Sequence, residues 1–553
     1  MKKYNPLFVL AVLLLFSLES FAQSDAAWNQ KIDSLFTEWN TPNHPGGAIA
    51  VMKDGKTIFS QAYGLASLEY LVPNSTGTIF NTGSVSKQFT AMGIVRLEEE
   101  GKLSFDDDIR KFIPELPDFG EKITIRHMLH HTSGLRSLHT LFGLAGWRDD
   151  DSRTNADLNR IILNQEDLNF SPGSEYLYCN TGYMLMVNII ENVTGEVFKE
   201  WMHKNIFSEL NMSQTYVEDL YSRVVPNNAT SYYGSDNFER AVEYWGYVGS
   251  GNMHSTTADL LTWLSNFSHP QKGWESSFQK MQTVDLLTDG SENNYAFGVI
   301  VDEHLGRKRI QHGGSIGGFR AYVATYPEEE LSIVALTNFS AGNPGGHSNQ
   351  IAEIILGKSN TEAAPKPAIK SISLNNEALA KFEGTYWDDK AKSMQKVQLK
   401  NDTLRYSGTG RERALVPISS NTFKLLNVPA DVEVKFETAA KKDQLLVSVD
   451  GSGPSIFDEV ENPEFKEEDL KDYVGEYYSS EVETTYTISV KDDKIELYQV
   501  RHGFIPAKVL FKDVITADYP TNVVQFVRDS KGKVTGILIT NGRVRNAWFK
   551  KVL

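Results

Sequence analysis

A serine followed three residues later by a lysine stands where a strand-like segment passes into a helix-like one, in Ser84-Val85-Ser86-Lys87. The preceding residues 77–83 are rich in β-branched and aromatic side chains, and residues 88–97 have helical character. Side chains three residues apart lie on one face of a helix, so the lysine amine can reach the serine hydroxyl. An amine that takes the hydroxyl proton converts a weak alcohol into a nucleophile for acyl transfer. We therefore expect a fold in which a strand leads into a buried helix with this serine at its first turn.

The spacing by itself is not specific, because any short motif has chance matches. It recurs at Ser277/Lys280, Ser393/Lys396 and Ser530/Lys533. The context of Ser84 is different, because Gly83 permits a tight turn into the helix. The helix that follows carries an apolar stripe of roughly helical period, which predicts that it is buried. The stripe consists of Phe89, Met92, Val95 and Leu97.

Two further elements suit the same chemistry. Tyr178-Cys179-Asn180 is the only Tyr-x-Asn sequence in the chain, and it lies between a Pro-Gly turn and an apolar stretch that reads as a helix. His312-Gly313-Gly314-Ser315 follows the strand-like residues 309–311 and precedes a second strand-like stretch, 319–326. Small residues in a strand allow its backbone to approach a substrate closely. The sequence therefore predicts a site assembled from three distant segments.

In this order, the three elements resemble those of the serine β-lactamase and penicillin-binding-protein superfamily. Tyr-x-Asn is typical of its class C-like branch, which also contains esterases, D-aminopeptidases and D-alanyl-D-alanine carboxypeptidases. The similarity continues through residues 123–135, 249–256 and 295–299, so it covers about residues 28–358. It implies a mixed α/β domain, assigned to residues 23–358, with an antiparallel sheet flanked by helices.

The resemblance also implies roles for individual residues. Ser84 would be the acylated nucleophile, and Lys87 would take part in proton transfer. Tyr178 would be the general base, its pKa lowered by the neighbouring lysine. The backbone N–H groups of Ser84 and Ser315 would form the oxyanion hole, which stabilises a tetrahedral intermediate by about 3 kcal/mol per donor.

The substrate-binding residues implied in the same way are Asn180, His312, Gly313 and Gly314. Asn180 would hydrogen-bond an amide of the substrate. His312 departs from the pattern, because β-lactamases and many penicillin-binding proteins carry a lysine there to face the substrate carboxylate. Histidine is largely neutral at pH 7. This difference favours esters, amides, or peptides that are recognised by their amino end. A purely structural role for His312 in the strand is the alternative.

Residues 1–22 are expected to be a secretory signal peptide. Lys2 and Lys3 precede a short apolar core, residues 7–16, and Ser20-Phe21-Ala22 is a small-x-small cleavage site. The core is too short to span a bilayer comfortably. The expected location is therefore periplasmic or secreted, with no stable membrane insertion after cleavage; an uncleaved anchor is the alternative.

The character of the chain changes after the catalytic segment. Residues 359–370 form a polar, proline-containing linker. Beyond it, short strand-like runs alternate with turns, and the sequence 379–386 is echoed by 470–477. We therefore predict two small all-β barrels of lipocalin-like type, residues 371–462 and 463–553, a layout similar to that of D-aminopeptidases. These β domains are candidate surfaces for an oligomer.

Composition narrows the function further. The chain has 553 residues and a formal net charge of −16, which argues against nucleic-acid binding. Its single cysteine, Cys179, cannot form an intramolecular disulfide. His127, His130 and His131 cluster in sequence, but no nearby carboxylate or cysteine completes a ligand set, so neither a metal nor a cofactor is expected.

Together these features predict an exported serine hydrolase that forms an acyl-enzyme at Ser84. Its expected substrates are small amides, peptides containing D-amino acids, or esters. Alternatives within the enzymes are a penicillin-binding protein, a class C-like β-lactamase or a D-Ala-D-Ala carboxypeptidase. An alternative of another class is a slow-turnover sensor or a pseudoenzyme.

Overall fold

The computed structural model describes residues 28–357, 369–408, 412–426, 428, 431–439, 442–449, 453–461, 465–492 and 494–552. The expected signal peptide and most of the expected linker lie outside these ranges. The chain divides into two compact units, with the boundary between Asn360 and Thr361 and with Gly143–Gly146 assigned to the second unit. Within the described ranges, no helix combines the length and the apolar character needed to cross a bilayer.

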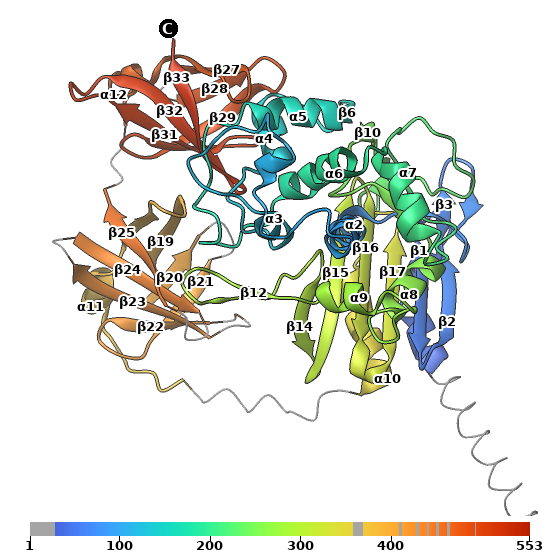
Figure 1. The fold of residues 1–553 in the computed structure, drawn as a ribbon. Coiled ribbons are helices and arrows are strands. Elements are labelled where there is room, and N and C mark those ends of the chain that lie inside the picture. Colours follow the sequence, from blue (N-terminus) through green and yellow to red (C-terminus); the bar gives the residue numbers. More distant parts are fainter. Residues whose placement is uncertain are drawn as a thin grey trace, which may run out of the picture. The chain divides into compact units, whose positions relative to one another are not determined.

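The first unit is built on a six-stranded antiparallel sheet (Figure 1). Its order is β14 (Ile300–His304), β15 (Arg307–Ile316), β16 (Phe319–Tyr326), β17 (Leu331–Thr337), β1 (Gly47–Lys53) and β2 (Lys56–Tyr63). All seven residues of β17 are buried, as expected of a central strand covered on both faces. The first strand of the unit pairs with its last, since Gly47 lies opposite Thr337.

Helices surround this sheet. They are α2 (Lys87–Glu99), α3 (Ile125–Leu129), α4 (Leu138–Leu144), α5 (Asn155–Leu163), α6 (Asn180–Thr194), α7 (Phe198–Met202), α8 (Thr257–Ser265), α9 (Glu275–Lys280) and α10 (Pro344–Leu356). Helices α8 and α10 contact β16 and β17, and α2 contacts α6. Buried residues of α10 and of the sheet, among them Ile351 and Ile333, share one apolar cluster. Burial of such apolar surface stabilises the layered arrangement.

Short elements complete the first unit. The strands are β3 (Leu65–Ser67), β4 (Val72–Pro73), β5 (Phe80–Asn81), β6 (Arg153–Thr154), β7 (Tyr216–Val217), β8 (Tyr232–Tyr233), β9 (Glu239–Arg240), β10 (Trp245–Gly246), β11 (Met253–Ser255), β12 (Asp285–Leu286) and β13 (Glu292–Asn293). The short helices are η1 (Thr37–Asn40), η2 (Gly83–Ser86), η3 (Ile109–Lys111), η4 (His203–Phe207) and η5 (Pro327–Glu329). Strand β5 pairs with β11 and leads directly into η2, which carries Ser84.

The second unit contains two closed barrels of eight antiparallel strands each. The first comprises β18 (Gly384–Asp388), β19 (Ser393–Lys400), β20 (Thr403–Ser407), β21 (Arg413–Pro417), β22 (Thr422–Leu425), β23 (Val432–Ala439), β24 (Lys442–Val449) and β25 (Ser455–Val460). The second comprises β26 (Gly475–Ser479), β27 (Thr484–Lys491), β28 (Lys494–Gln499), β29 (Gly503–Phe511), β30 (Val514–Ala517), β31 (Asn522–Arg528), β32 (Val534–Asn541) and β33 (Val544–Lys551). The predicted fold class, a β-lactamase-like domain followed by two all-β barrels, is confirmed.

The similarity between residues 379–386 and 470–477 corresponds to a repeated structural arrangement, in which a short helix precedes the first strand of each barrel. These helices are α11 (Asn376–Ala380) before β18, and α12 (Glu467–Leu470) with η6 (Lys471–Tyr473) before β26. In both barrels a buried tyrosine of the first strand donates its hydroxyl to a carbonyl four residues earlier: Tyr386 to Phe382 at 3.2 Å, and Tyr477 to Tyr473 at 2.7 Å. The repeat therefore encodes how the first strand is joined to its preceding helix.

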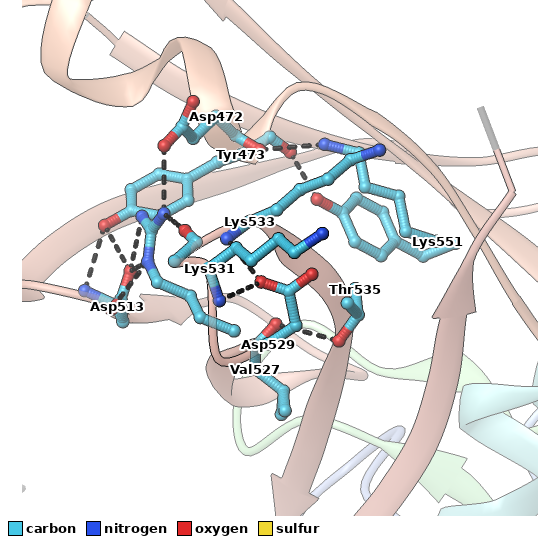
Figure 2. A network of polar contacts seen from close by, with 12 residues as sticks. Asp472, Tyr473, Asp513, Val527, Asp529, Lys531, Lys533, Thr535 and Lys551 are labelled. Atoms are coloured by element: carbon cyan, nitrogen blue, oxygen red, sulfur yellow. Dashed lines mark hydrogen bonds and ion pairs between the residues drawn. The ribbon is translucent and has the colours of Figure 1, made fainter.

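In the second barrel this junction carries a charged network (Figure 2). The Arg528 guanidinium donates to both carboxylate oxygens of Asp513, at 2.9 and 3.0 Å, and to Asp472 at 2.9 Å. The Tyr473 hydroxyl donates to Asp513 at 3.0 Å, and its ring stacks on Phe526 with centroids 3.9 Å apart. These contacts fix η6 against β31 and the turn that precedes β30.

Candidate active site

The structure places Ser84 and Lys87 together, as the spacing predicts. Ser84 lies in the turn η2, and Lys87 begins α2. Lys87 Nζ donates to Ser84 Oγ at 3.1 Å and to the Ser250 carbonyl at 2.7 Å. The lysine side chain is fully buried. A buried amine held by a backbone carbonyl is fixed in orientation, so its contact with Ser84 is preorganised.

Two glycines bring the amides of Ser84 and Ser315 close to each other. Gly83 has φ of +52°, which favours glycine, and a Cβ there would lie 2.6 Å from Ser315 N. A Cβ on Gly314 would lie 2.0 Å from Thr82 O and 3.2 Å from Ser84 N. The turn η2 and strand β15 can approach this closely only because both positions lack a side chain. The two candidate oxyanion donors therefore belong to adjoining backbone segments.

Tyr178 and Asn180 lie at the start of α6. Lys87 Nζ is 4.8 Å from the centre of the Tyr178 ring. Asn180 is the first residue of α6 and is buried, and its Oδ1 has no hydrogen-bond partner among the described residues. A buried amide oxygen normally has a partner, so one supplied by a substrate would satisfy it.

His312 lies on β15, two residues before the tight contact at Gly314. It is buried, and its Nδ1 lies 2.6 Å from the Gly313 carbonyl, which can only accept, so Nδ1 carries a hydrogen. Its Nε2 is 3.0 Å from Tyr295 Oη. Burial, and to a lesser degree the charge of Lys87, lower the pKa of His312 to about 3. The imidazole is therefore neutral at pH 7 and accepts a hydrogen bond from the Tyr295 hydroxyl at Nε2.

Tyr295 and His131 are neighbours of the site to which the sequence analysis assigned no role. Burial raises the pKa of Tyr295 well above its usual value, so its hydroxyl stays protonated and donates to His312. The His131 ring lies 4.2 Å from that of Tyr178 and 4.4 Å from that of Tyr295, centroid to centroid. His131 Nδ1 also accepts the Cys179 amide at 3.1 Å. Both residues lie in segments that resemble the family, 123–135 and 295–299, and this resemblance was the one signal in the sequence that could have pointed to them.

A profile of the Beta-lactamase family matches residues 32–357, which is more than half of the chain. The chain belongs to this family. A D-aminopeptidase of Brucella anthropi is 24% identical over 92% of this chain and 95% of its own length. Penicillin-binding protein 4* of Bacillus subtilis is 26% identical over 76% of this chain and 96% of its own length.

A solved structure of an octameric penicillin-binding protein homologue from Pyrococcus abyssi shows 25% identity and a TM-score of 0.54. The match covers 77% of this chain and 99% of that one. The chain spans just over half, 56%, of a further curated relative, a D-aminopeptidase of Gluconobacter oxydans. The prediction of a serine hydrolase related to β-lactamases, penicillin-binding proteins and D-aminopeptidases is confirmed by these matches.

Proposed function

We propose that this β-lactamase-family hydrolase cleaves small amides or peptides whose acyl group is a D-amino acid with a free amine. Ser84 is the nucleophile, and Lys87 with Tyr178 moves the protons. The observation that carries the proposal is the Ser84–Lys87 contact of 3.1 Å beside a neutral His312. The relative aligned over most of this chain is named D-aminopeptidase, which supports the same substrate class.

Acylation follows from the positions of these groups. Tyr178 accepts the Ser84 hydroxyl proton as Oγ attacks the substrate carbonyl carbon, while Lys87 holds Oγ through its hydrogen bond. The negative charge that develops on the carbonyl oxygen is stabilised by the N–H groups of Ser84 and Ser315. The proton passes to the leaving amine as the C–N bond breaks, which leaves an ester at Ser84. Water activated by Tyr178 then hydrolyses the ester, and the proton returns to Ser84.

Selectivity against carboxylate-ended substrates rests on His312. A neutral ring cannot supply the fixed positive charge that a lysine would place there. The Oδ1 of Asn180, which has no partner in the described part of the chain, is an acceptor suited to an N–H group on the substrate. At Gly313 a Cβ would meet nothing closer than 3.8 Å, so this position leaves room for a substrate along β15, whereas the space at Gly314 is taken up by the backbone of η2. These features favour an amine-ended or neutral acyl group.

A penicillin-binding or β-lactamase activity is the second candidate, and the relative named penicillin-binding protein 4* favours it. Under either activity we infer that the enzyme is exported through cleavage of residues 1–22 and works on a small-molecule or peptide substrate. An oligomer formed through the β domains is part of this proposal, and the octameric homologue gives a precedent for assembly.

The experiment compares hydrolysis of D-alanyl-p-nitroanilide, acetyl-D-Ala-D-Ala and a reporter β-lactam by the wild-type enzyme. We expect turnover of the first substrate, with weak or no activity on the other two. Intact-mass analysis after fluorophosphonate treatment should show one adduct in the wild type and none in Ser84→Ala.

Ser393→Ala is a matched control, because Ser393 also precedes a lysine by three residues but lies in β19 of the first barrel. This variant should keep both the label and the activity. Turnover of the β-lactam with no action on the D-alanyl anilide would favour the second candidate. Absence of any Ser84-dependent adduct would refute the acyl-enzyme proposal.

A further inference from the structure

A hollow lies in the first unit, separate from the residues assigned to catalysis. It has a volume of about 440 Å³, within the usual range for small-ligand sites. Its walls come from β5, β9, β10, β11, the segment 218–231 and the start of β16, and they include Asn81, Ser231, Glu243, Trp245 and Phe319. Its lining does not contain Ser84, Lys87, Tyr178 or His312.

Glu243 is the residue of this hollow that indicates a cationic ligand. Its carboxylate accepts a hydrogen bond from the Ser231 hydroxyl. Ser231 Oγ in turn accepts the Gly318 amide at 3.1 Å. Glu243 is half-buried, and among the described residues no cationic side chain forms an ion pair with it, although a carboxylate shielded from water is usually paired. The nearby guanidinium of Arg320 is bound instead to the carbonyls of Gly317 and Phe319.

The other charged groups of the hollow are less available to a ligand. Arg223 donates to Asp219 at 2.6 Å and lies 4.0 Å from Glu218. Arg240 is exposed on β9. Burial lowers the pKa of His254 to about 3, so this ring is neutral at pH 7. Burial raises the pKa of Glu243 to about 7, and the charge of the nearby Arg320 only partly opposes this shift. Glu243 is therefore the carboxylate of the lining that forms no ion pair with a described residue.

The rim of the hollow is aromatic and apolar. Tyr221 and Tyr244 are 44% and 46% exposed, and their rings lie 5.3 Å apart between centroids. Val224 and Val242 are exposed beside them. Aromatic faces attract cations and also cover apolar groups. The combination fits a ligand with a charged amine on an aromatic or aliphatic body.

The floor of the hollow is connected to the nucleophile turn. Asn81 Oδ1 accepts the Gly83 amide at 3.0 Å, and Asn81 Nδ2 donates to Asn252 Oδ1 at 2.9 Å. Asn252 lies two residues after Ser250, whose carbonyl holds Lys87. A ligand in the hollow would therefore rest on residues that position Ser84 and Lys87.

We propose that this hollow binds the ammonium group of a small primary amine, with Glu243 as its counter-ion. The amine belongs either to the end of a substrate or to a separate effector. This inference does not depend on the proposed function, because the binding is measured without turnover.

The test measures binding of phenethylamine at pH 8 by isothermal titration calorimetry, with 2-phenylethanol as the neutral isostere. We expect saturable binding of the amine to the wild type and at least tenfold weaker binding of the alcohol. Glu243→Gln should weaken amine binding at least tenfold without changing the affinity for the alcohol. Glu239→Gln is the matched control, since Glu239 is exposed on β9 and does not line the hollow.

Equal affinity of the wild type for amine and alcohol, or unchanged amine binding in Glu243→Gln, would overturn the proposal. The comparison of amine with alcohol in the wild type holds even if Glu243→Gln folds poorly. A further arm repeats the titration on enzyme labelled at Ser84 by a fluorophosphonate. Both of its outcomes uphold the site: retained binding identifies a separate effector, and lost binding identifies the amine end of a substrate.

Discussion

At the scale of single residues, the site depends on two places where a side chain is absent. Gly83 and Gly314 allow the backbone of η2 to lie against β15, and this contact brings together the amides of Ser84 and Ser315. Oxyanion stabilisation depends on the position of such donors to within a fraction of an ångström. Small displacements of either segment should therefore affect catalysis more than stability.

Gly314→Ala should reduce kcat by about 10²–10³-fold, the usual cost of losing an oxyanion donor. A Cβ on Gly314 would meet Thr82 O at 2.0 Å and push the two segments apart. Gly77→Ala is the control from outside the site, because a Cβ there would find its nearest neighbour, Ser75 Oγ, at 3.8 Å. Steady-state kinetics on the D-alanyl anilide, with circular dichroism as a check on folding, measures both variants. Equal activity of the two variants would contradict this account of the oxyanion hole.

His312→Lys should raise kcat/KM for acetyl-D-Ala-D-Ala by about tenfold, since a charge-assisted hydrogen bond to the carboxylate contributes about 1.5–3 kcal/mol. The reason is that the native imidazole, with its pKa lowered to about 3, stays neutral at working pH. If no gain is measured, the charge argument for selectivity fails.

The lowered pKa of His312 also predicts how activity depends on pH. A group that has lost its proton above about pH 3 contributes no titration between pH 5 and pH 8. His312→Gln should therefore leave the shape of the pH profile of kcat/KM unchanged in this window, whatever it does to the absolute rate. A limb of the profile that disappears in His312→Gln would show that the ring titrates.

The sequence was sufficient for the Ser84–Lys87 pair because both residues lie in one short helical turn, where spacing determines geometry. It was not sufficient for the Lys87–Ser250 or Tyr295–His312 hydrogen bonds. These contacts join distant segments and depend on how the segments pack, which no spacing rule encodes. The hollow beside Glu243 was missed for the same reason.

At the scale of secondary-structure elements, each barrel repeats one arrangement with different chemistry. In both barrels an aromatic residue before the first strand packs on a phenylalanine of a later strand: Phe382 on Phe436, and Tyr473 on Phe526. The alternating strand pattern and the sequence echo could be predicted, because period-2 alternation and repeats are visible in a chain. The Arg528 network was not predictable, since its members are not adjacent in sequence.

Arg528→Met should lower the free energy of unfolding of the second barrel by about 1–2 kcal/mol. The change removes the hydrogen bonds from the guanidinium to Asp513 and Asp472, and it leaves two carboxylates without their cation. Hydrogen exchange read by mass spectrometry should show faster exchange in β30 and β31. Lys531→Met is the control from the loop that follows β31. Only the backbone amide of Lys531 bonds Asp529, at 2.9 Å (Figure 2), and its side chain forms no hydrogen bond or ion pair with any described residue. Equal effects of the two substitutions would contradict the role given to Arg528.

At the scale of the whole molecule, the central sheet of the first unit is complete only when strands from the two ends of that unit pair with each other. The order β14-β15-β16-β17-β1-β2 places the first strand of the unit beside the last. Ser84 follows the early strands, whereas His312 and Ser315 lie on β15 near the end of the unit. Such non-local pairing is formed late and slowly in folding. It could not be deduced from local patterns, and the family resemblance implied only an antiparallel sheet flanked by helices.

Export of the whole chain is expected to remove residues 1–22. The amino-terminal lysines, the apolar core and the small residues before Gln23 match the three parts expected of a cleavable signal. Intact mass spectrometry of protein recovered from the periplasm or medium of an expressing bacterium should give a chain that begins at Gln23. Lys2→Glu combined with Lys3→Glu removes the positive region and should leave the full-length precursor in the cytosol. Recovery of wild-type protein in the membrane with residues 1–22 still attached would contradict cleavage and identify an anchor instead.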